Sequence, residues 1–240
     1  MKNDLNKQDV EKNKIDAIQK LDNFIEELIN KDEEKSLKKA NLISYWLKEY
    51  SRYIKNEKTF DPKKQENYKR GDIIKVNLGF NIGNEEGGLH YAIVINNPDK
   101  SSGLVTIVPL TSRKNITNLH YSEVLLGNSL VTNIITKLRY LADNLEIAVK
   151  AAGTLENIDE RTAECDKLKK ICIELQKYIE EAQKMKNDES IALVGNITTI
   201  SKQRIYTPTL KNKFLKGITL SEEQLDLIDN KIRELYTKDK

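Results

Sequence analysis

The part of this chain richest in groups that could do chemistry runs from Gly79 to Tyr91, with the sequence GFNIGNEEGGLHY. It holds four glycines, two carboxylates and a histidine. Glycines let a backbone approach a ligand closely and present its N–H groups, while carboxylates and imidazoles can transfer protons. The segment lacks the Gly-Lys-Ser/Thr ending of a P-loop, and no crossover helix is expected after it, as dinucleotide binding would require. Composition alone leaves two interpretations open, a ligand site and a flexible surface loop.

Cys165 and Cys172 are the only cysteines, and His90 and His120 are the only histidines. The cysteines lie seven residues apart in an expected helix, about 10.5 Å along its axis, which is too far for a disulfide. This set does not match the usual Cys/His zinc sites, so we expect neither a metal nor a cofactor. No apolar run reaches the length of a membrane span and no signal-peptide pattern is present. We therefore expect a reduced, cytoplasmic chain without membrane contact.

Glycine content divides the 240-residue chain, because residues 1–70 contain none whereas residues 71–128 contain seven of the ten. The glycine-rich centre carries short segments rich in β-branched residues and bounded by turn-forming residues, which is typical of strands. We expect strands at 71–78, 91–97, 104–110 and 119–126, and strand-like structure again at 189–201.

Elsewhere apolar residues recur at three- and four-residue spacing, which predicts helices. Two are expected at 8–30 and 33–56. A long antiparallel hairpin is expected within 130–187, with its turn at Gly153 and Thr154. Its second arm has a heptad seam, which predicts a coiled coil with these side chains in its core: Ile158, Cys165, Leu168, Cys172, Leu175, Ile179 and Ala182.

The C-terminal region carries two further patterns. Ser221 and Gln224 have the spacing of a capping box, which predicts the start of a closing helix. No acidic residue occurs between Glu189 and Glu222, while basic residues accumulate there: Lys202, Arg204, Lys211, Lys213 and Lys216. The whole chain carries a net charge of only +3. A local positive field of this kind can attract phosphates, and it is equally typical of a solvated loop.

Several segments occur in an order that is itself informative. They are Gly71-Asp72-Ile73-Ile74, Gly83-Asn84-Glu85-Glu86-Gly87-Gly88, Tyr91-Ala92-Ile93-Val94-Ile95, Val108-Pro109-Leu110-Thr111-Ser112, Ile200-Ser201-Lys202-Gln203-Arg204-Ile205 and Ser221-Glu222-Glu223-Gln224-Leu225. Together they resemble the MazF/PemK family of toxin endoribonucleases, whose patterns include G-S-E-Q-G-G-x-R-P, hydrophobic-P-x-T-[ST] and I-D-K-x-R-L. The resemblance covers 70–127 and 190–237.

The resemblance implies an α+β fold with a small SH3-like β-barrel and a C-terminal helix, usually in a homodimer. On this basis we expect an N-terminal helical arm (1–60), a barrel with its closing helix (70–127 plus 190–240) and a coiled-coil hairpin (130–187) that interrupts the barrel. The resemblance also implies a component of a toxin–antitoxin system that cleaves single-stranded RNA without a metal. In that reaction the ribose 2′-hydroxyl attacks the neighbouring phosphate. The implied protein partner is an antitoxin with an acidic, disordered tail.

Carried over by position, the family's threonine is Thr111, its glutamate is Glu85 and its arginine is replaced by His90. The family's serine position is Asn84, and Tyr91 replaces the proline. A histidine cannot make the bidentate phosphate contact of an arginine, but it exchanges a proton near neutral pH. We expect His90, Thr111 and Glu85 to be catalytic; the alternative is a decayed site in which His90 only fills space. RNA contacts are expected from these residues: Asn84, Gly87, Gly88, Ser112, Arg113, Lys114, Lys202 and Arg204.

Two wider alternatives stay open. Phe80 and Tyr91 could stack on a base or pack in a core. The whole chain could instead be a non-catalytic interaction module, in which a decayed barrel carries the arm and the hairpin. Growth arrest on expression in a bacterium would favour the toxin over the module.

Overall fold

The computed structural model describes residues 6–112, 118–185 and 189–238. It divides into two compact units, one comprising Met1–Phe60 with Leu78–Gly88 and the other Asp61–Asn77 with Leu89–Lys240. Residues 79–88, called the glycine-rich loop below, therefore group with the N-terminal helices. Two of the predicted RNA-binding residues, Arg113 and Lys114, lie outside the described residues.

The first unit is built on α1 (Lys7–Asn30) and α2 (Glu34–Asn56), close to the two helices predicted from spacing. The side-chain oxygen of Asn6 accepts a hydrogen bond from the N–H of Asp9 (2.9 Å). This cap satisfies one of the amide groups that the first turn of α1 leaves unpaired.

The apolar stripes of α1 and α2 meet in a small core. Leu28, Ala40 and Ile43 are buried there. Partly buried apolar side chains surround them: Leu21, Ile25, Leu47 and Phe80. Phe80 belongs to the glycine-rich loop, so the loop contributes an aromatic ring to the core of the helical pair.

The described residues contain one sheet of seven strands. They are β1 (Ile73–Gly79), β2 (Gly88–Val94), β3 (Leu104–Ser112), β4 (Glu123–Gly127), β5 (Ser190–Leu193), β6 (Thr198–Ser201) and β7 (Ile205–Thr207). The hydrogen-bonded order is β4-β5-β3-β2-β1-β7, and β6 pairs with β3. The pairs β1–β7, β2–β3, β3–β5, β3–β6 and β4–β5 are antiparallel. The helices and the antiparallel sheet together confirm the predicted α+β class. β4 and β7 lie at the two ends of the strand order, so the sheet in the described residues is open.

The strands are rich in β-branched residues, which favour extended backbone and are buried in the core of the sheet. Ile73, Ile93, Ile107 and Ile191 are completely buried, and burial of such side chains contributes about 1.5–3 kcal/mol each. Three short 3₁₀ segments link or precede strands, at Pro62–Lys64, Val194–Asn196 and Lys202–Arg204. The second of them splits the segment predicted as strand-like at 189–201.

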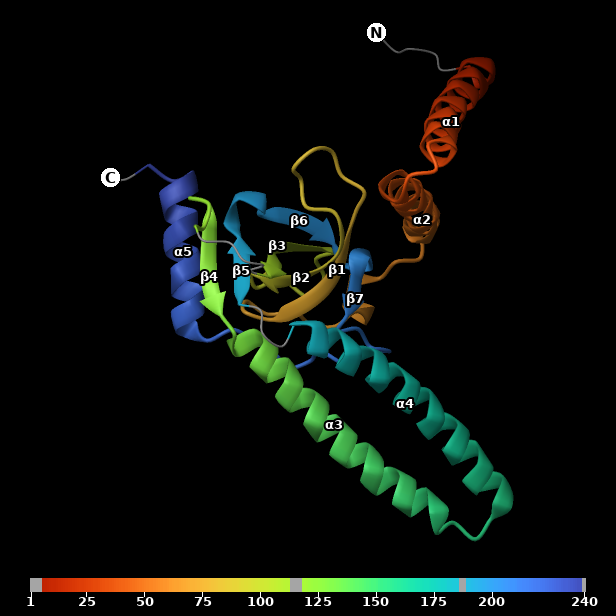
Figure 1. The fold of residues 1–240 in the computed structure, drawn as a ribbon, viewed down its shortest axis with the longest axis vertical. Helices are drawn as coiled ribbons and strands as arrows, with labels where there is room; N and C mark the ends of the chain where they lie inside the picture. The colour runs from red at the N-terminus through yellow and green to blue at the C-terminus, as the bar shows by residue number, and fades with distance from the viewer. Residues whose placement is uncertain (1–5, 113–117, 186–188, 239–240) are drawn as a thin grey trace. The chain divides into compact units, whose positions relative to one another are not determined.

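The closing helix α5 (Glu222–Tyr236) lies along β4 (Figure 1). The predicted capping box is confirmed, since Ser221 accepts from the N–H of Gln224 and the Gln224 side chain accepts from the N–H of Ser221. The side-chain Nε2 of Gln224 also donates to the carbonyl of Leu126 in β4 (2.7 Å). The cap therefore both starts the helix and attaches it to the sheet.

Helices α3 (Ser129–Gly153) and α4 (Ile158–Met185) are consecutive and pack side by side (Figure 1). Leu130, Ile134 and Leu138 of α3 are at most 4% exposed and belong to the main core with the sheet. None of the helices in the described part of the chain is long and apolar enough to cross a membrane.

The heptad interpretation of α4 is wrong for Ile158, which is 67% exposed, and for its two cysteines. Leu168, Leu175 and Ala182 are buried at strict seven-residue spacing, whereas Cys165 and Cys172 are exposed. A full seam needs neighbours that cover two lines of residues. Contact with α3 covers the first line and leaves the cysteine positions in solvent.

Candidate active site

The strands that carry His90 and Thr111 are neighbours in the sheet. Ala92 of β2 lies opposite Pro109 of β3, where the recorded pairing of the two strands ends. The Nδ1 atom of His90 lies 3.4 Å from the carbonyl oxygen of Leu110, the residue before Thr111. The structure thus places two of the three predicted catalytic residues on neighbouring strands.

Both residues are half-buried, as is Ser112. β3 is held on its other side by β5, where Thr111 pairs with Ile191 and Ser112 with Ser190. Strand pairing with β5 fixes the backbone of β3 at these positions. The hydroxyl of Thr111 is therefore placed by the sheet rather than by a mobile loop.

Tyr91 follows His90 and, by strand alternation, its side chain leaves the opposite face of the sheet. Its hydroxyl donates a hydrogen bond to Glu181 of α4 (3.2 Å), and the Lys75 ammonium lies 5.3 Å from the centre of its ring. Lys75 also contacts both carboxylate oxygens of Glu181 (2.6 and 2.7 Å). Burial and the Glu181 carboxylate raise the pKa of Tyr91. Tyr91 therefore packs against α4 in this structure, which agrees with the packing alternative.

The glycine-rich loop, in the first unit, carries Glu85 on its exposed part. The amide nitrogen of the Asn81 side chain donates to the carbonyl of Glu86 (2.6 Å). The N–H of Glu85 donates to the carbonyl of Ile82 (3.3 Å), and a Glu85 carboxylate oxygen lies 3.4 Å from the Ile82 nitrogen. These short-range bonds give the loop a defined conformation around its carboxylate.

The other predicted residues of the loop differ in their surroundings. Asn84 is exposed. A Cβ added to Gly87 would lie 2.9 Å from the carbonyl oxygen of Gly79, so the close approach of the two ends of the loop requires a glycine at position 87. Gly88 begins β2, and none of the described atoms lies within 4 Å of where its Cβ would be.

Lys202 and Arg204 occupy different places. Lys202 is 3% exposed; its backbone N–H donates to the Gly103 carbonyl and its ammonium lies 3.4 Å from the carbonyl of Asp99. Burial lowers the pKa of this ammonium. Arg204 donates through Nε to the carbonyl of Asn77 in β1 (2.9 Å), next to the strand that carries His90. Lys202 is thus bound at the turn between β2 and β3, and Arg204 at β1.

The predicted site residues consequently fall into two groups. His90, Thr111, Ser112, Lys202 and Arg204 lie in the second unit. Asn84, Glu85, Gly87 and Gly88 lie in the first. Within the second unit His90 contacts the carbonyl of Leu110 in β3, and within the first unit hydrogen bonds order the loop around Glu85.

Sequence reasoning missed the cluster formed by Lys75, Tyr91 and Glu181. The single local signal is Lys75 itself, a basic residue inside the otherwise apolar strand GDIIKVNL. Its partner lies 106 positions away on α4, and no spacing pattern connects the two. Only the packing of α4 against the sheet brings the carboxylate to the lysine.

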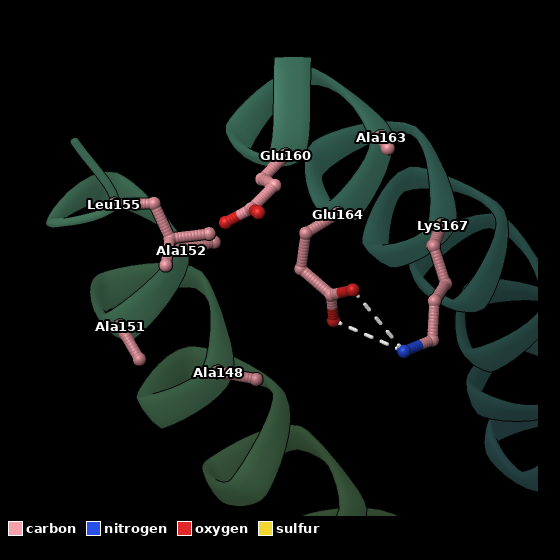
Figure 2. A pocket seen from close by; sticks show the side chains of 8 residues that line it. All are labelled: Ala148, Ala151, Ala152, Leu155, Glu160, Ala163, Glu164 and Lys167. Atoms are coloured by element: carbon pink, nitrogen blue, oxygen red, sulfur yellow. Dashed lines mark hydrogen bonds and ion pairs between the residues drawn. The ribbon is translucent and has the colours of Figure 1, made fainter. Parts of the chain in front are cut away.

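A pocket opens between α3 and α4 near the turn that joins them (Figure 2). It is lined by Ala148, Ala151, Ala152, Leu155, Glu160, Ala163, Glu164 and Lys167. Glu164 and Lys167 form an ion pair at its rim (3.1 Å). None of the predicted site residues lines it, and small side chains of α3 form one wall.

Comparison with known families gives a match. The model of the PemK-like, MazF-like toxins of type II toxin–antitoxin systems matches residues 69–171. The match includes Glu85, His90 and Thr111, continues into α4, and does not include Lys202 or Arg204. Among curated proteins, none matches this chain. Residues 69–171 thus match the model of this toxin family, which confirms the predicted resemblance over 70–127, while the second predicted range, 190–237, lies outside the match.

Proposed function

We propose that this chain is a toxin endoribonuclease that cleaves single-stranded RNA, with His90 as its central proton-transfer group. The observation that supports the proposal is that His90 and Thr111 lie on the neighbouring strands β2 and β3, with His90 Nδ1 3.4 Å from the carbonyl oxygen of Leu110, inside the matched segment. An imidazole and a hydroxyl held on neighbouring strands supply two of the functions that RNA cleavage requires. The family match supports a toxin of this kind.

The reaction places three demands on the site. A base must take the proton of the ribose 2′-hydroxyl, whose oxygen then forms a bond to the neighbouring phosphorus. A proton must reach the departing 5′-oxygen as the P–O5′ bond breaks, which leaves a 2′,3′-cyclic phosphate and a 5′-hydroxyl. Hydrogen-bond donors must stabilise the charge on the phosphorane. We assign proton transfer to His90, phosphate stabilisation to Thr111, and orientation or proton transfer to Glu85.

The finer features of the proposal rest on the same resemblance. They are an SH3-like barrel interrupted by a helical hairpin, a cytoplasmic homodimer, metal-independent cleavage and inhibition by an antitoxin. Backbone contacts to RNA are assigned to the remaining predicted residues: Asn84, Gly87, Gly88, Ser112, Arg113, Lys114, Lys202 and Arg204. The assignment is better supported for Arg204, which binds the Asn77 carbonyl of β1, the strand next to β2. Lys202 is buried, and its ammonium contacts the Asp99 carbonyl.

The test compares purified wild type with His90→Ala on a long single-stranded RNA in the presence of EDTA, with product ends analysed for cyclic phosphate. Loss of a positioned acid or base costs about 10²–10⁴ in rate, so His90→Ala should nearly abolish cleavage. Thr111→Val should cost less, because it removes one donor to the phosphate. His90→Arg, which puts the family's residue at this position, should cleave faster than His90→Ala, because a guanidinium can still contact the phosphate.

The second histidine supplies a matched control. His120 is exposed, and its Nδ1 lies 2.8 Å from the hydroxyl of Ser122. His120→Ala should cleave at the wild-type rate. Equal cleavage by wild type and His90→Ala would remove His90 from the mechanism, and no cleavage by either would favour the non-catalytic interaction module.

A further inference from the structure

The glycine-rich loop is held at its first two residues by the N-terminal helices. A Cβ added to Gly79 would lie 2.7 Å from Cζ2 of Trp46, so the indole ring of α2 lies directly against the Gly79 backbone. Gly79 also has a φ of +85°, a conformation that other residues rarely adopt. The next residue, Phe80, packs against the core of α1 and α2.

The ring of Trp46 is itself held in place by other aromatic residues of α2. Its centroid lies 5.7 Å from that of Tyr50 and 6.2 Å from that of Tyr53. The Arg52 guanidinium lies 5.0 Å from the centre of the Tyr53 ring. Tyr50 and Tyr53 lie four and seven positions after Trp46, which places all three on one face of the helix. The surface on which Gly79 rests is therefore a braced aromatic row.

The loop also closes on this anchored end. The side chain of Asn81 binds the carbonyl of Glu86, and Gly87 approaches the carbonyl of Gly79. Residues 82–85, which lie between these contacts, are exposed and include Asn84 and Glu85. Their position is fixed through the base of the loop, and the base is fixed by α2.

We propose that the α1–α2 arm positions the glycine-rich loop for RNA cleavage, with Trp46 and Phe80 as its positioning residues. The effect on catalysis rests on the proposed function. The contact between the arm and the loop does not depend on the proposed function. The arm contacts residues 79 and 80, and the two ends of the loop meet at these residues. The Glu85 carboxylate is therefore already ordered before RNA binds. Pre-ordering of this kind removes an entropic cost from substrate binding.

The coupling is measured by millisecond hydrogen exchange at the amides of Ile82 and Glu85. Wild type is compared with Trp46→Ala, Phe80→Ala and the control Tyr45→Ala. Tyr45 is 60% exposed on α2. Exchange in the loop should be at least about tenfold faster in Trp46→Ala and Phe80→Ala, because opening of the loop no longer breaks its contact with the arm. It should be unchanged in Tyr45→Ala.

Trp46 offers a second measurement, since it is the only tryptophan of the chain. Its fluorescence reports the contact with Gly79 directly. Phe80→Ala and the milder Phe80→Leu should both red-shift its emission, as the loop leaves the ring and water replaces it. Phe80→Leu keeps an apolar side chain in the core, so it remains informative should Phe80→Ala unfold the arm.

The catalytic consequence is measured with single-stranded RNA. Trp46→Ala should lower kcat/KM by about 10- to 100-fold, the effect of misplacing a catalytic group. Trp46→Phe should recover most of it, because a smaller ring still covers Gly79. A role confined to stability would change the fraction of folded protein and leave kcat and KM of the folded molecules unaltered.

The outcomes separate the two proposals. Equal loop exchange in all four proteins would overturn the arm–loop coupling. Faster loop exchange with unchanged kcat and KM would overturn the positioning role. Faster loop exchange in a chain whose wild type does not cleave RNA would sink the proposed function and leave the coupling established.

Discussion

Helices α1 and α2 bury Leu28, Ala40 and Ile43 between them, whereas α3 and α4 extend the core of the sheet. The first pair has little apolar area to stabilise it and takes an additional ring, Phe80, from the glycine-rich loop. The second pair inserts Leu130 and Ile134 among the strands. Two helical pairs of similar length thus depend on different partners. The arm packs against the glycine-rich loop, and the second pair packs against the sheet.

The largest expected effect comes from removing equivalent apolar volume in the two cores. Ile134→Ala should cost about 2–5 kcal/mol of the free energy of unfolding of the sheet unit, because Ile134 is 1% exposed. Leu28→Ala should instead speed hydrogen exchange in α1, α2 and the loop while the sheet melts as in wild type. Urea unfolding with exchange mass spectrometry separates the two effects. Equal loss of sheet stability in both variants would contradict the comparison.

The next effect concerns the polar attachment of α4. Glu181→Ala removes the partner of Lys75, whose side chain is 8% exposed while that of Glu181 is 41% exposed. Because one partner is half in solvent, we expect a loss of about 1–2 kcal/mol in urea unfolding, below the value for fully buried pairs. Glu164→Ala breaks the exposed pair with Lys167 and should cost less than about 0.5 kcal/mol. A larger loss from Glu164→Ala would mean that the outer ends of the helices matter more than their bases.

A smaller effect appears at alkaline pH. Burial first, and then Glu181, raise the pKa of Tyr91 in the folded chain. The unfolded chain therefore loses the phenolic proton at lower pH, so the stabilisation is complete below about pH 10 and is lost as the pH rises beyond it. Tyr91→Phe should reduce the slope of this loss in urea unfolding measured between pH 9 and 11. An identical slope in both proteins would show that Tyr91 does not contribute to it.

The smallest effect is expected at the two thiols. Cys165 and Cys172 are exposed on α4, so both should react with a chromogenic thiol reagent in the native state at nearly the rate of the unfolded chain. Cys165→Ser and Cys172→Ser should each change the free energy of unfolding by less than about 0.5 kcal/mol. Protected thiols would restore the heptad seam that the structure contradicts.

Local patterns predicted most of the secondary structure. The helices of the arm, the strands of the centre and the capping box at Ser221 each depend on neighbouring residues, which the sequence displays directly. The pairing of β2, which carries His90, with β3 was also within reach, because both strands lie in consecutive motifs of the sequence. Register then follows from the antiparallel geometry.

The features that the sequence did not predict depend on contacts between segments that are distant in the sequence. A heptad pattern does not say how many helices surround it, and α4 has one line of buried positions where the pattern predicted two. Phe80 was ambiguous between base stacking and core packing until the arm provided the core. Glu181 has no local signal at all, because its partners Lys75 and Tyr91 are joined to it only through the tertiary fold.

The turn between α3 and α4 has a practical use in protein engineering. Asn157 caps α4 by accepting hydrogen bonds from the N–H groups of Asp159 and Glu160, and Glu156 before it is exposed. A peptide tag inserted after Glu156 leaves that cap intact and disturbs no residue of the main core. The helices place this point roughly 35 Å along their axes from the start of α3. An immobilised or labelled chain can therefore be handled from this end while the strands carrying His90 and Thr111 stay unmodified.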